Sequence, residues 1–157
     1  MRDHLEKRTN GTFYEVIMAG GFRELENITA DLGIEAWGIG LEDAFTSAVH
    51  GLASLLSDSS GGDQPLTRSI RIEAGSLPSL LVKLLNEIIY LEDTESFLPG
   101  KITHLNIRNN HLDATFTGAI YDPEIHTLNA HIKAATYHGL EIDQSSERVT
   151  IKVIFDV

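Results

Sequence analysis

The clearest signal in the sequence is a two-residue alternation of apolar and polar positions in two stretches. The first covers residues 31–37 and the second covers residues 149–157. A period of two is the pattern of a strand that buries one of its faces. Both stretches therefore predict half-buried strands, and Asp31 is expected to lie on the face opposite Leu32.

Two other stretches carry apolar residues at helical spacing and predict two long amphipathic helices. The first covers residues 41–57 and has two acids in its first turn, where the helix dipole favours negative charge. The second runs from Leu77 to about Glu92. Ser76 is its expected N-cap, and Pro78 is tolerated in its first turn.

Shorter β-rich runs lie between and after these helices. A short strand is predicted at residues 70–72 and a further strand at residues 129–137. Residues 102–108 and 111–120 flank Asn109-Asn110, and asparagine accepts the positive φ that a tight hairpin turn requires. These two runs are therefore expected to form a hairpin.

The order of these elements predicts a single domain of the α+β class. Six or seven strands, joined by hairpins rather than by helical crossovers, form a mostly antiparallel sheet packed against the two long helices. Residues 57–65 are rich in Ser, Gly and Asp and end in Pro, so we expect an exposed loop there. Residues 1–21 show no clean period and are predicted to be a flexible N-terminal extension, which leaves residues 22–157 as the folded domain.

Composition excludes several classes of protein. A length of 157 residues suits one domain, and no run approaches the ~20 apolar residues of a membrane-spanning helix. The first residues mix both charges without an apolar segment, so we expect a cytoplasmic protein without a secretory signal. The absence of cysteine excludes disulfides, thiolate metal sites and thiol catalysis.

The charge balance narrows the range of partners. The chain has 12 Lys and Arg residues against 23 Asp and Glu residues, a net charge of −11. Because clustered Lys and Arg hold phosphate backbones, this balance argues against direct tight binding to naked nucleic acid. It favours cations or a basic protein surface as partners. The alternative explanation is that the acids simply maintain solubility.

Standard catalytic motifs are missing from the sequence, including the phosphate loop, the nucleophile elbow and His-Glu-x-x-His. Gly38-Ile39-Gly40 lies between a predicted strand and a predicted helix, but it lacks the third glycine of a dinucleotide site. The spacing of His126, His131 and His138 favours structural or surface histidines over a zinc site. No catalytic residue is therefore assigned.

Acids at the ends of two predicted strands form a candidate metal site. Asp31 opens one strand, and Asp156 is the penultimate residue of the other. With the terminal carboxylate of Val157 they could gather oxygen atoms around a hard cation such as Ca²⁺ or Mg²⁺. Ordinary solvated acids are the alternative.

Lys133 stands in a segment that is otherwise poor in charge. It either forms an ordinary ion pair or presents its ammonium group to a phosphate or to a partner's carboxylate. The sequence pattern by itself does not choose between these roles.

Several segments resemble the archease family, in the same order and up to the last residue. The similarity runs from about Phe22 to Val157 and includes Asp122-Pro123-Glu124 with His126. The four segments that carry it are Thr29-Ala30-Asp31-Leu32-Gly33-Ile34, Leu84-Leu85-Asn86-Glu87-Ile88-Ile89-Tyr90-Leu91, Lys133-Ala134-Ala135-Thr136-Tyr137-His138-Gly139-Leu140 and Ile154-Phe155-Asp156-Val157.

Archeases are small cytoplasmic proteins that assist the RtcB-type RNA ligase. This ligase joins RNA ends bearing a 2′,3′-cyclic phosphate or a 3′-phosphate to a 5′-hydroxyl, in tRNA splicing and RNA repair. The resemblance implies that the chain is an accessory activator and not itself an enzyme. It would promote GTP-dependent guanylylation of the ligase's active-site histidine and its multiple turnover. RNA would be contacted only through the ligase.

The resemblance also implies roles for individual residues. The family's metal site, reported with calcium, corresponds here to Asp31, Asp156 and Val157, with Mg²⁺ or Mn²⁺ as alternatives. Lys133 matches the family lysine associated with ligase activation. Ile28 stands where the family's His-Thr-Ala-Asp motif has histidine. Metal affinity or metal choice is therefore expected to differ in this chain.

Two other functions remain open at this stage. One is a stand-alone metal-dependent phosphohydrolase that uses the same carboxylates. Only Lys133 and His138 are at hand for it, and their spacing fixes neither a nucleophile nor a base. The other is a general chaperone or interaction module. A test with GTP, metal ions and phosphoesters separates these, because an archease is silent until its ligase is added.

Overall fold

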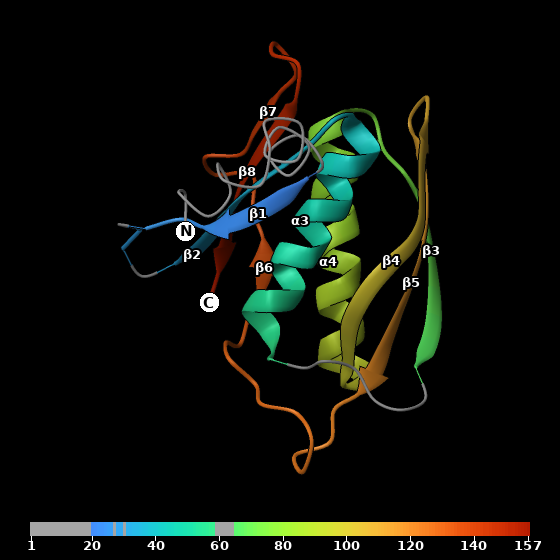
Figure 1. Ribbon diagram of the computed structural model, residues 1–157, viewed down its shortest axis with the longest axis vertical. Coiled ribbons are helices and arrows are strands. Elements are labelled where there is room, and N and C mark those ends of the chain that lie inside the picture. Colours follow the sequence, from blue (N-terminus) through green and yellow to red (C-terminus); the bar gives the residue numbers. More distant parts are fainter. Residues whose placement is uncertain (1–19, 27, 30, 59–64) are drawn as a thin grey trace, which may run out of the picture.

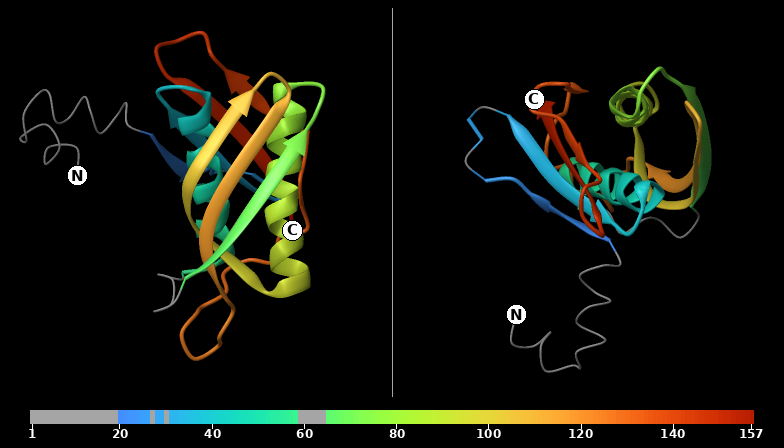
Figure 2. Two further views of the ribbon diagram at one scale, coloured as in Figure 1. Left: turned by 90° about the vertical axis from the view of Figure 1, so that its right-hand side faces the viewer. Right: turned by 90° about the horizontal axis from the view of Figure 1, so that it is seen from above.

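The structure is a computed structural model that describes residues 20–26, 28–29, 31–58 and 65–157. It confirms the α+β class but has two antiparallel sheets instead of the one predicted. The two helices lie between the sheets, so the fold has three layers (Figures 1 and 2). Both sheets thus cover apolar helix faces, and a single sheet could cover only one side of the helix pair.

The first sheet has five strands in the order β1-β2-β8-β6, with β7 also paired to β8. All of its pairings are antiparallel. Strand β8 is its centre, because three other strands pair with it. The five strands are β1 (Gly21–Glu24), β2 (Leu32–Gly38), β6 (Ala134–Ala135), β7 (Glu141–Asp143) and β8 (Val149–Asp156).

The second sheet has three strands in the order β3-β5-β4. They are β3 (Leu66–Glu73), β4 (Phe97–Arg108) and β5 (His111–Ile120). The predicted hairpin between β4 and β5 is confirmed, and Asn109 has the expected positive φ of 54°. Strand β4 begins earlier than predicted because the chain reverses at Ser96, which has a φ of 57°.

The helices α3 (Leu41–Leu56) and α4 (Leu77–Glu95) confirm both helix predictions. At the start of α4, the Ser76 side chain accepts a hydrogen bond from the backbone N–H of Ser79 at 3.2 Å. This is the N-cap expected from the sequence. Helix α4 extends one turn beyond the predicted end, up to the left-handed residue Ser96.

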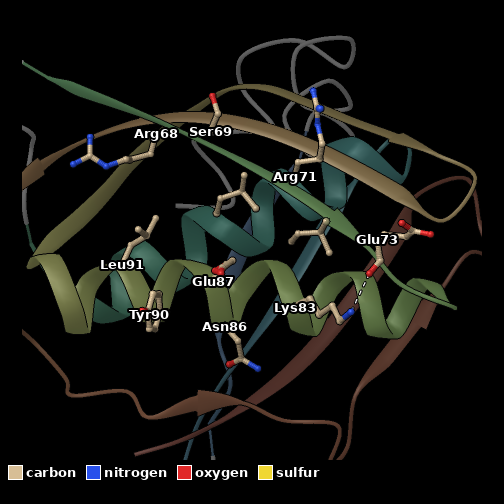
Figure 3. A pocket seen from close by; sticks show the side chains of 11 residues that line it. Arg68, Ser69, Arg71, Glu73, Lys83, Asn86, Glu87, Tyr90 and Leu91 are labelled. Atoms are coloured by element: carbon tan, nitrogen blue, oxygen red, sulfur yellow. Dashed lines mark hydrogen bonds between the residues drawn. The ribbon is translucent and has the colours of Figure 1, made fainter.

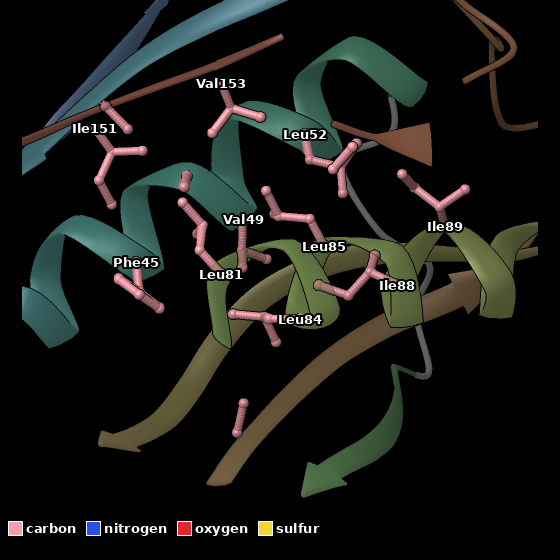
Figure 4. Close-up of a cluster of buried hydrophobic side chains, with 14 of the residues drawn as sticks. Phe45, Val49, Leu52, Leu81, Leu84, Leu85, Ile88, Ile89, Ile151 and Val153 are labelled. Atoms are coloured by element: carbon pink, nitrogen blue, oxygen red, sulfur yellow. The ribbon is translucent and has the colours of Figure 1, made fainter. Parts of the chain in front are cut away.

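The core lies between the two helices and the sheet faces that cover them (Figure 4). Its members come from both helices and from strands of both sheets and are fully or almost fully buried. They include Phe45, Val49 and Leu52 of α3, Leu81, Leu84, Leu85 and Ile88 of α4, and Ile151 and Val153 of β8. Burial of such side chains contributes about 1.5–3 kcal/mol each, so this core contributes strongly to stability.

The strand predicted at residues 129–137 is mostly wrong. Only Ala134–Ala135 form a strand, because the preceding residues make other hydrogen bonds. Asn129 donates to the backbone oxygen of Ser54 at 3.1 Å and to Oδ1 of Asp58 at 2.9 Å. Its own N–H donates to the carbonyl oxygen of Leu56. The segment thus fastens the end of α3 instead of joining a sheet.

The predicted loop at residues 57–65 needs a correction at its start. Ser57 is buried and forms an isolated bridge with Leu128, whereas residues 59–64 lie outside the described part of the chain. The short strands β1 and β7 were not expected from the sequence. Of the predicted extension, residues 1–19 also lie outside the described part, and Gly21 already belongs to β1.

Gly38 has a structural role in place of the rejected nucleotide-binding role. A Cβ atom at this position would lie 2.4 Å from Cβ of Asp43 and 2.5 Å from the backbone nitrogen of Ala44. Glycine therefore lets the end of β2 pack closely against the first turn of α3. Among the described residues, no helix is both long and apolar enough to cross a membrane.

Candidate functional site

Antiparallel pairing brings the predicted site residues to one end of the five-stranded sheet. Leu32 pairs with Phe155, so the register places Asp31 across from Asp156. On the other side of β8, Ala134 pairs with Asp156, and the N–H of Lys133 donates to the carbonyl oxygen of Asp156 at 2.9 Å. Residues far apart in the sequence thus meet at the C-terminal end of β8.

Asp31 lines a pocket of about 450 Å³ on the outer face of this sheet. Alternation along β2 explains its position, because Ile34 and Ala36 point into the core and Asp31 has the opposite parity. His138 and Lys152 line the same pocket. The site therefore offers an acid, an imidazole and an ammonium group to a ligand on the outer face.

Ile28 also lines this pocket. A Cβ atom at Gly33 would lie 2.7 Å from Cδ1 of Ile28 and 2.9 Å from Cδ1 of Ile154. The isoleucine at the position of the family histidine thus packs in an apolar contact over β2 and β8. An imidazole does come to the pocket, but it belongs to His138 and arrives from another segment.

Lys133 lines a different pocket, of about 370 Å³, between the β6 segment and α4. Tyr90, Asp93 and His131 share that pocket. The side chain of Lys133 is exposed. It is therefore available to a partner while its backbone is fixed to β8.

Charged groups of both signs lie near Lys133. Burial raises the pKa of Glu92, the positive charge of His131 opposes this rise, and the negative charge of Asp93 adds to it. Asp93 and Lys133 line the same pocket. A cation or a phosphate that approaches this side of the protein would therefore meet both positive and negative groups around Lys133.

Asn86 of α4 holds the β6 segment in place. Its amide donates to the carbonyl oxygen of Ala135 at 3.3 Å and accepts from the N–H of Ala135 at 2.7 Å. This is the pattern that a neighbouring strand would provide. The Leu84–Leu91 segment was singled out from the sequence only as part of the resemblance, and this contact explains what Asn86 does there.

The chemistry of the donor set fits a hard cation. The register places Asp31 and Asp156, which both carry carboxylates, opposite each other at the end of the sheet, and Val157 follows Asp156. Oxygen donors of this kind suit Ca²⁺ or Mg²⁺ rather than a soft metal. Within the described ranges, no three side chains of His, Cys, Asp or Glu converge on a metal position. The set therefore supplies only part of a coordination shell.

The three histidines considered for zinc lie in different surroundings. His126 is buried and accepts a hydrogen bond from the N–H of Asp122 at Nδ1, 2.9 Å away. His131 and His138 line separate pockets. The three histidines therefore do not share one site in the described part of the molecule.

The sequence did not point to a further pocket of about 720 Å³ between β3 and α4 (Figure 3). Arg68 and Arg71 line it from β3, and Lys83 and Tyr90 line it from α4. The only sequence signal at these positions was an alternation too short to show that β3 is the edge of a second sheet.

These features define a small α+β protein with a five-stranded sheet. At one end of this sheet, acids lie on the outer face and a lysine lies on the face toward α4. Residues 22–157 match the model of the Archease protein family (MTH1598/TM1083). The chain therefore belongs to the archease family.

Known proteins of similar sequence support this membership. The chain is 32% identical to the protein archease of Pyrobaculum neutrophilum over 133 residues, which cover 82% of this chain and 90% of that protein. It is 33% identical to the protein archease of Pyrobaculum islandicum, with the same coverage.

Two solved structures have the same fold. The solution structure of Methanobacterium thermoautotrophicum protein 1598 superposes with a TM-score of 0.69 at 28% identity. The match covers 88% of this chain and 99% of that one. The crystal structure of an archease and possible chaperone from Thermotoga maritima has a TM-score of 0.58 at 23% identity, covering 86% and 97%. The second likeness concerns the fold alone.

Proposed function

We propose that this protein activates an RtcB-type RNA ligase, by promoting GTP-dependent guanylylation of the ligase and its multiple turnover. The observation that carries the proposal is the convergence of Asp31, Asp156 and Lys133 on one end of the sheet, in a chain of the archease family. The proposal places the protein in the cytoplasm beside its ligase. It also leaves RNA to the ligase, which agrees with the net charge of −11.

The proposal includes a divalent cation, with Ca²⁺ favoured over Mg²⁺ or Mn²⁺. Asp31 and Asp156 would hold it, with a main-chain oxygen of Val157. When bound, the ion would supply positive charge that stabilises developing charge on phosphate. Because these donors are few for a Ca²⁺ shell of six to eight oxygens, water and ligase groups would have to complete the coordination.

Lys133 would act separately from the acids. It lies on the α4 side of the sheet, whereas Asp31 lies on the outer side. A ligase that covers the end of the sheet would contact both faces at once. Its phosphate or carboxylate groups would meet the Lys133 ammonium, and the carboxylates would face its metal and nucleotide pocket. The end of the sheet is then a docking edge with two chemically distinct sides.

The test is a guanylylation assay of the cognate ligase with GTP, Mg²⁺ or Mn²⁺. Adding the wild-type protein should raise the rate of guanylylation and permit several ligations per ligase molecule. Asp31→Asn should remove most of this stimulation, because the amide keeps the shape but loses the charge. Asp113→Asn is the matched control, a half-exposed aspartate on the other sheet, and it should stimulate like the wild type.

Two results would contradict the proposal. One is an unchanged guanylylation rate at every ratio of activator to ligase. The other is hydrolysis of phosphoesters by the protein alone, which would favour the metal-dependent phosphohydrolase. Protection of unrelated proteins from aggregation, without any effect on the ligase, would favour the chaperone or interaction module instead.

A further inference from the structure

Strand β3 is an edge strand whose outward backbone groups are largely free. The N–H of Ala74 donates to the carbonyl oxygen of Asn110, which fixes the phase of the ladder between β3 and β5. The even-numbered residues of β3 therefore form the backbone hydrogen bonds to β5. The odd-numbered residues direct their N–H and C=O groups away from β5. Ser69 and Arg71 are the central odd residues of this edge.

Only the ends of this edge are covered. At one end, Nζ of Lys83 donates to the carbonyl oxygen of Glu73 at 2.9 Å. At the other, the carbonyl oxygen of Thr67 accepts from the Arg68 guanidinium. In the described part of the molecule, the outward N–H and C=O groups of Ser69 and Arg71 have no hydrogen-bond partner.

Helix side chains cover two comparable edges elsewhere in the fold. On the β4 edge, the N–H groups of Ile102 and Ile107 donate to Nε2 of His50 and Oε2 of Glu42, both on α3. The β6 edge is covered by Asn86. Unprotected edges invite another strand, so the open centre of β3 stands apart from the edges that α3 and α4 cover.

The open edge runs along the pocket between β3 and α4 (Figure 3). Ile70 and Ile72 form the apolar floor on the β3 side, and Leu91 and Tyr90 continue it on α4. Tyr90 is 60% exposed. A groove of about 720 Å³ with an open strand edge and an aromatic wall has the form of a strand-addition site for peptides.

Basic side chains outnumber acidic ones in the lining of the groove, which has three basic residues and the two acids Glu73 and Glu87. Arg2, Lys7 and Arg8 precede the described residues, so nine of the 12 basic residues lie in the described part. Three of these nine line the groove, namely Arg68, Arg71 and Lys83. The charge balance of this lining is therefore slightly positive, whereas the whole chain has a net charge of −11, so an acidic segment would meet less repulsion here than the net charge suggests.

The two arginines are held in position by acids. Arg68 pairs with Glu95 at 3.1 Å and Arg71 pairs with Asp113 at 2.8 Å. The Arg71 side chain is nevertheless 87% exposed. Its guanidinium has five donors, so it can bind a second carboxylate without releasing Asp113.

We propose that this groove binds an extended acidic segment of a partner protein, which adds to β3 as a further strand. Residues across from Ser69 and Arg71 would lie on the outer face near the Arg71 guanidinium and would be Asp or Glu. The residues between them would point toward Ile70 and Ile72 and would be apolar. Glu87 lines the α4 side and disfavours acids at these inward positions. The inference does not depend on the ligase proposal.

The probe is a short fluorescent peptide in which Glu alternates with Val or Ile. It should bind the full chain saturably, and amide hydrogen exchange at Ser69 and Arg71 should slow in its presence. A peptide with Lys in place of each Glu has the same strand propensity pattern and the opposite charge, and it should not bind. Equal binding of both peptides, or no binding of the acidic one, overturns the proposal.

A matched pair of variants tests the strand addition itself. Ser69→Pro removes an outward N–H while every bond from β3 to β5 stays intact, whereas Ser69→Ala keeps that N–H. The alanine variant should bind the acidic peptide like the wild type, and the proline variant should bind about tenfold more weakly. Equal binding by the two variants overturns the proposal.

Two further measurements test the charge argument and the possibility that a second copy of the chain occupies the edge. Arg71→Glu leaves the backbone unchanged and should also weaken binding of the acidic peptide, which gives a test even if Ser69→Pro does not fold. Unchanged affinity in Arg71→Glu would refute the charge argument. The molar mass of the protein alone is the last measurement. A dimer that Ser69→Pro converts to a monomer would show that a second copy occupies the edge, and the proposal would fail.

Discussion

At the scale of single residues, the candidate site has two chemically distinct groups of side chains that are connected through one backbone hydrogen bond. The N–H of Lys133 is bonded to the carbonyl oxygen of Asp156, but strand alternation directs neighbouring side chains to opposite faces. Lys133 therefore faces α4, and the aspartates face outward. A substitution in one group can leave the other group intact.

This separation gives the first prediction. Lys133→Met keeps the aliphatic stem and removes the charge, so it should abolish stimulation of ligase guanylylation and leave Ca²⁺ affinity unchanged. Asp31→Asn should lower both. Calorimetric Ca²⁺ titration and the guanylylation assay check the two effects side by side. A large loss of Ca²⁺ affinity in Lys133→Met would show that the two groups form a single site.

The second prediction concerns the position at which this chain departs from the family pattern. Ile28→His places an imidazole in the pocket of Asp31, where it can bond a ligand carboxylate from outside the metal's own shell. Groups of this kind change metal affinity by roughly 10–100-fold, and we expect tighter Ca²⁺ binding within that range. Calorimetry measures it, with Ile28→Asn as a polar control. Equal affinities of the two variants and the wild type would contradict a role for this position.

The residues of the candidate site can be named from the sequence, but their arrangement cannot. Asp31 and Asp156 followed from strand ends, because an alternating pattern shows where each strand stops. Their pairing depends on the register between β2 and β8, which no local pattern records. The packing of Ile28 over Gly33 is likewise a contact between distant segments. The family resemblance supplied the connection between these residues.

At the scale of elements, α4 supports both the core and the candidate site. Its apolar face holds Leu81, Leu84 and Leu85 in the centre of the protein. Its opposite side carries Asn86, which fastens Ala135 and so positions the Lys133 backbone. A single helix thus connects the stability of the core with the placement of Lys133.

The third prediction tests this connection. Asn86→Ala removes two hydrogen bonds and leaves the buried backbone of Ala135 unpaired, so the free energy of unfolding should fall by about 2–3 kcal/mol. Urea unfolding measures the change. Amide exchange at Lys133 and Ala135 should also become faster.

Asn106→Ala is the matched control. The Asn106 side chain lies on β4 and forms no hydrogen bond within the described part of the chain. Its replacement should change the free energy of unfolding by less than about 0.5 kcal/mol. If both variants lose the same stability, the Asn86 contact is not a special support of the β6 segment.

The elements predicted correctly are those with strong local signals. Both helices show a clear 3.6-residue period, and the hairpin has Asn109 at the required positive φ. The segment at 129–137 has the composition of a strand, but Asn129 is bonded to Ser54 and Asp58 instead. Tertiary hydrogen bonds override a weak β preference there, and the composition of the segment does not predict these bonds.

At the scale of the whole molecule, a contact between the helix layer and the second sheet affects how the stability of the protein depends on pH. His50 of α3 accepts a hydrogen bond from the N–H of Ile102 on β4, which ties the helix layer to the second sheet. Burial lowers the pKa of His50, and the positive charge of Lys101 lowers it further. The neutral imidazole is therefore the form that the folded protein favours.

The fourth prediction follows from the sign of this shift. Below the ordinary pKa of 6.5, the unfolded chain takes up a proton at His50 that the folded protein does not. Stability should therefore decrease as the pH falls below that value, until the lowered folded pKa is reached. His50→Gln keeps an acceptor and removes the titration. Its free energy of unfolding should decline less between about pH 7 and about pH 5, measured by urea unfolding. Identical declines in both proteins would contradict the assignment.

The number of sheets is a property of the whole molecule that the sequence did not predict. The strands themselves were mostly found, but whether they form one sheet or two depends on which ones pair. Strand β2 pairs with β8, and β5 pairs with β3 and β4. These pairings connect segments far apart in the sequence, so each short pattern is compatible with either arrangement.

The central place of β8 affects how the protein folds during translation. Strand β2 leaves the ribosome before β8, which supplies Phe155 and its neighbours as partners, so β2 cannot complete its pairing until β8 has been synthesised. Helices α3 and α4 and the sheet of β3, β4 and β5 can form before then, because their contacts are more local. Nascent chains that lack β8 therefore cannot bring Asp31 and Asp156 together, and a partner that recognises this pair would not bind them.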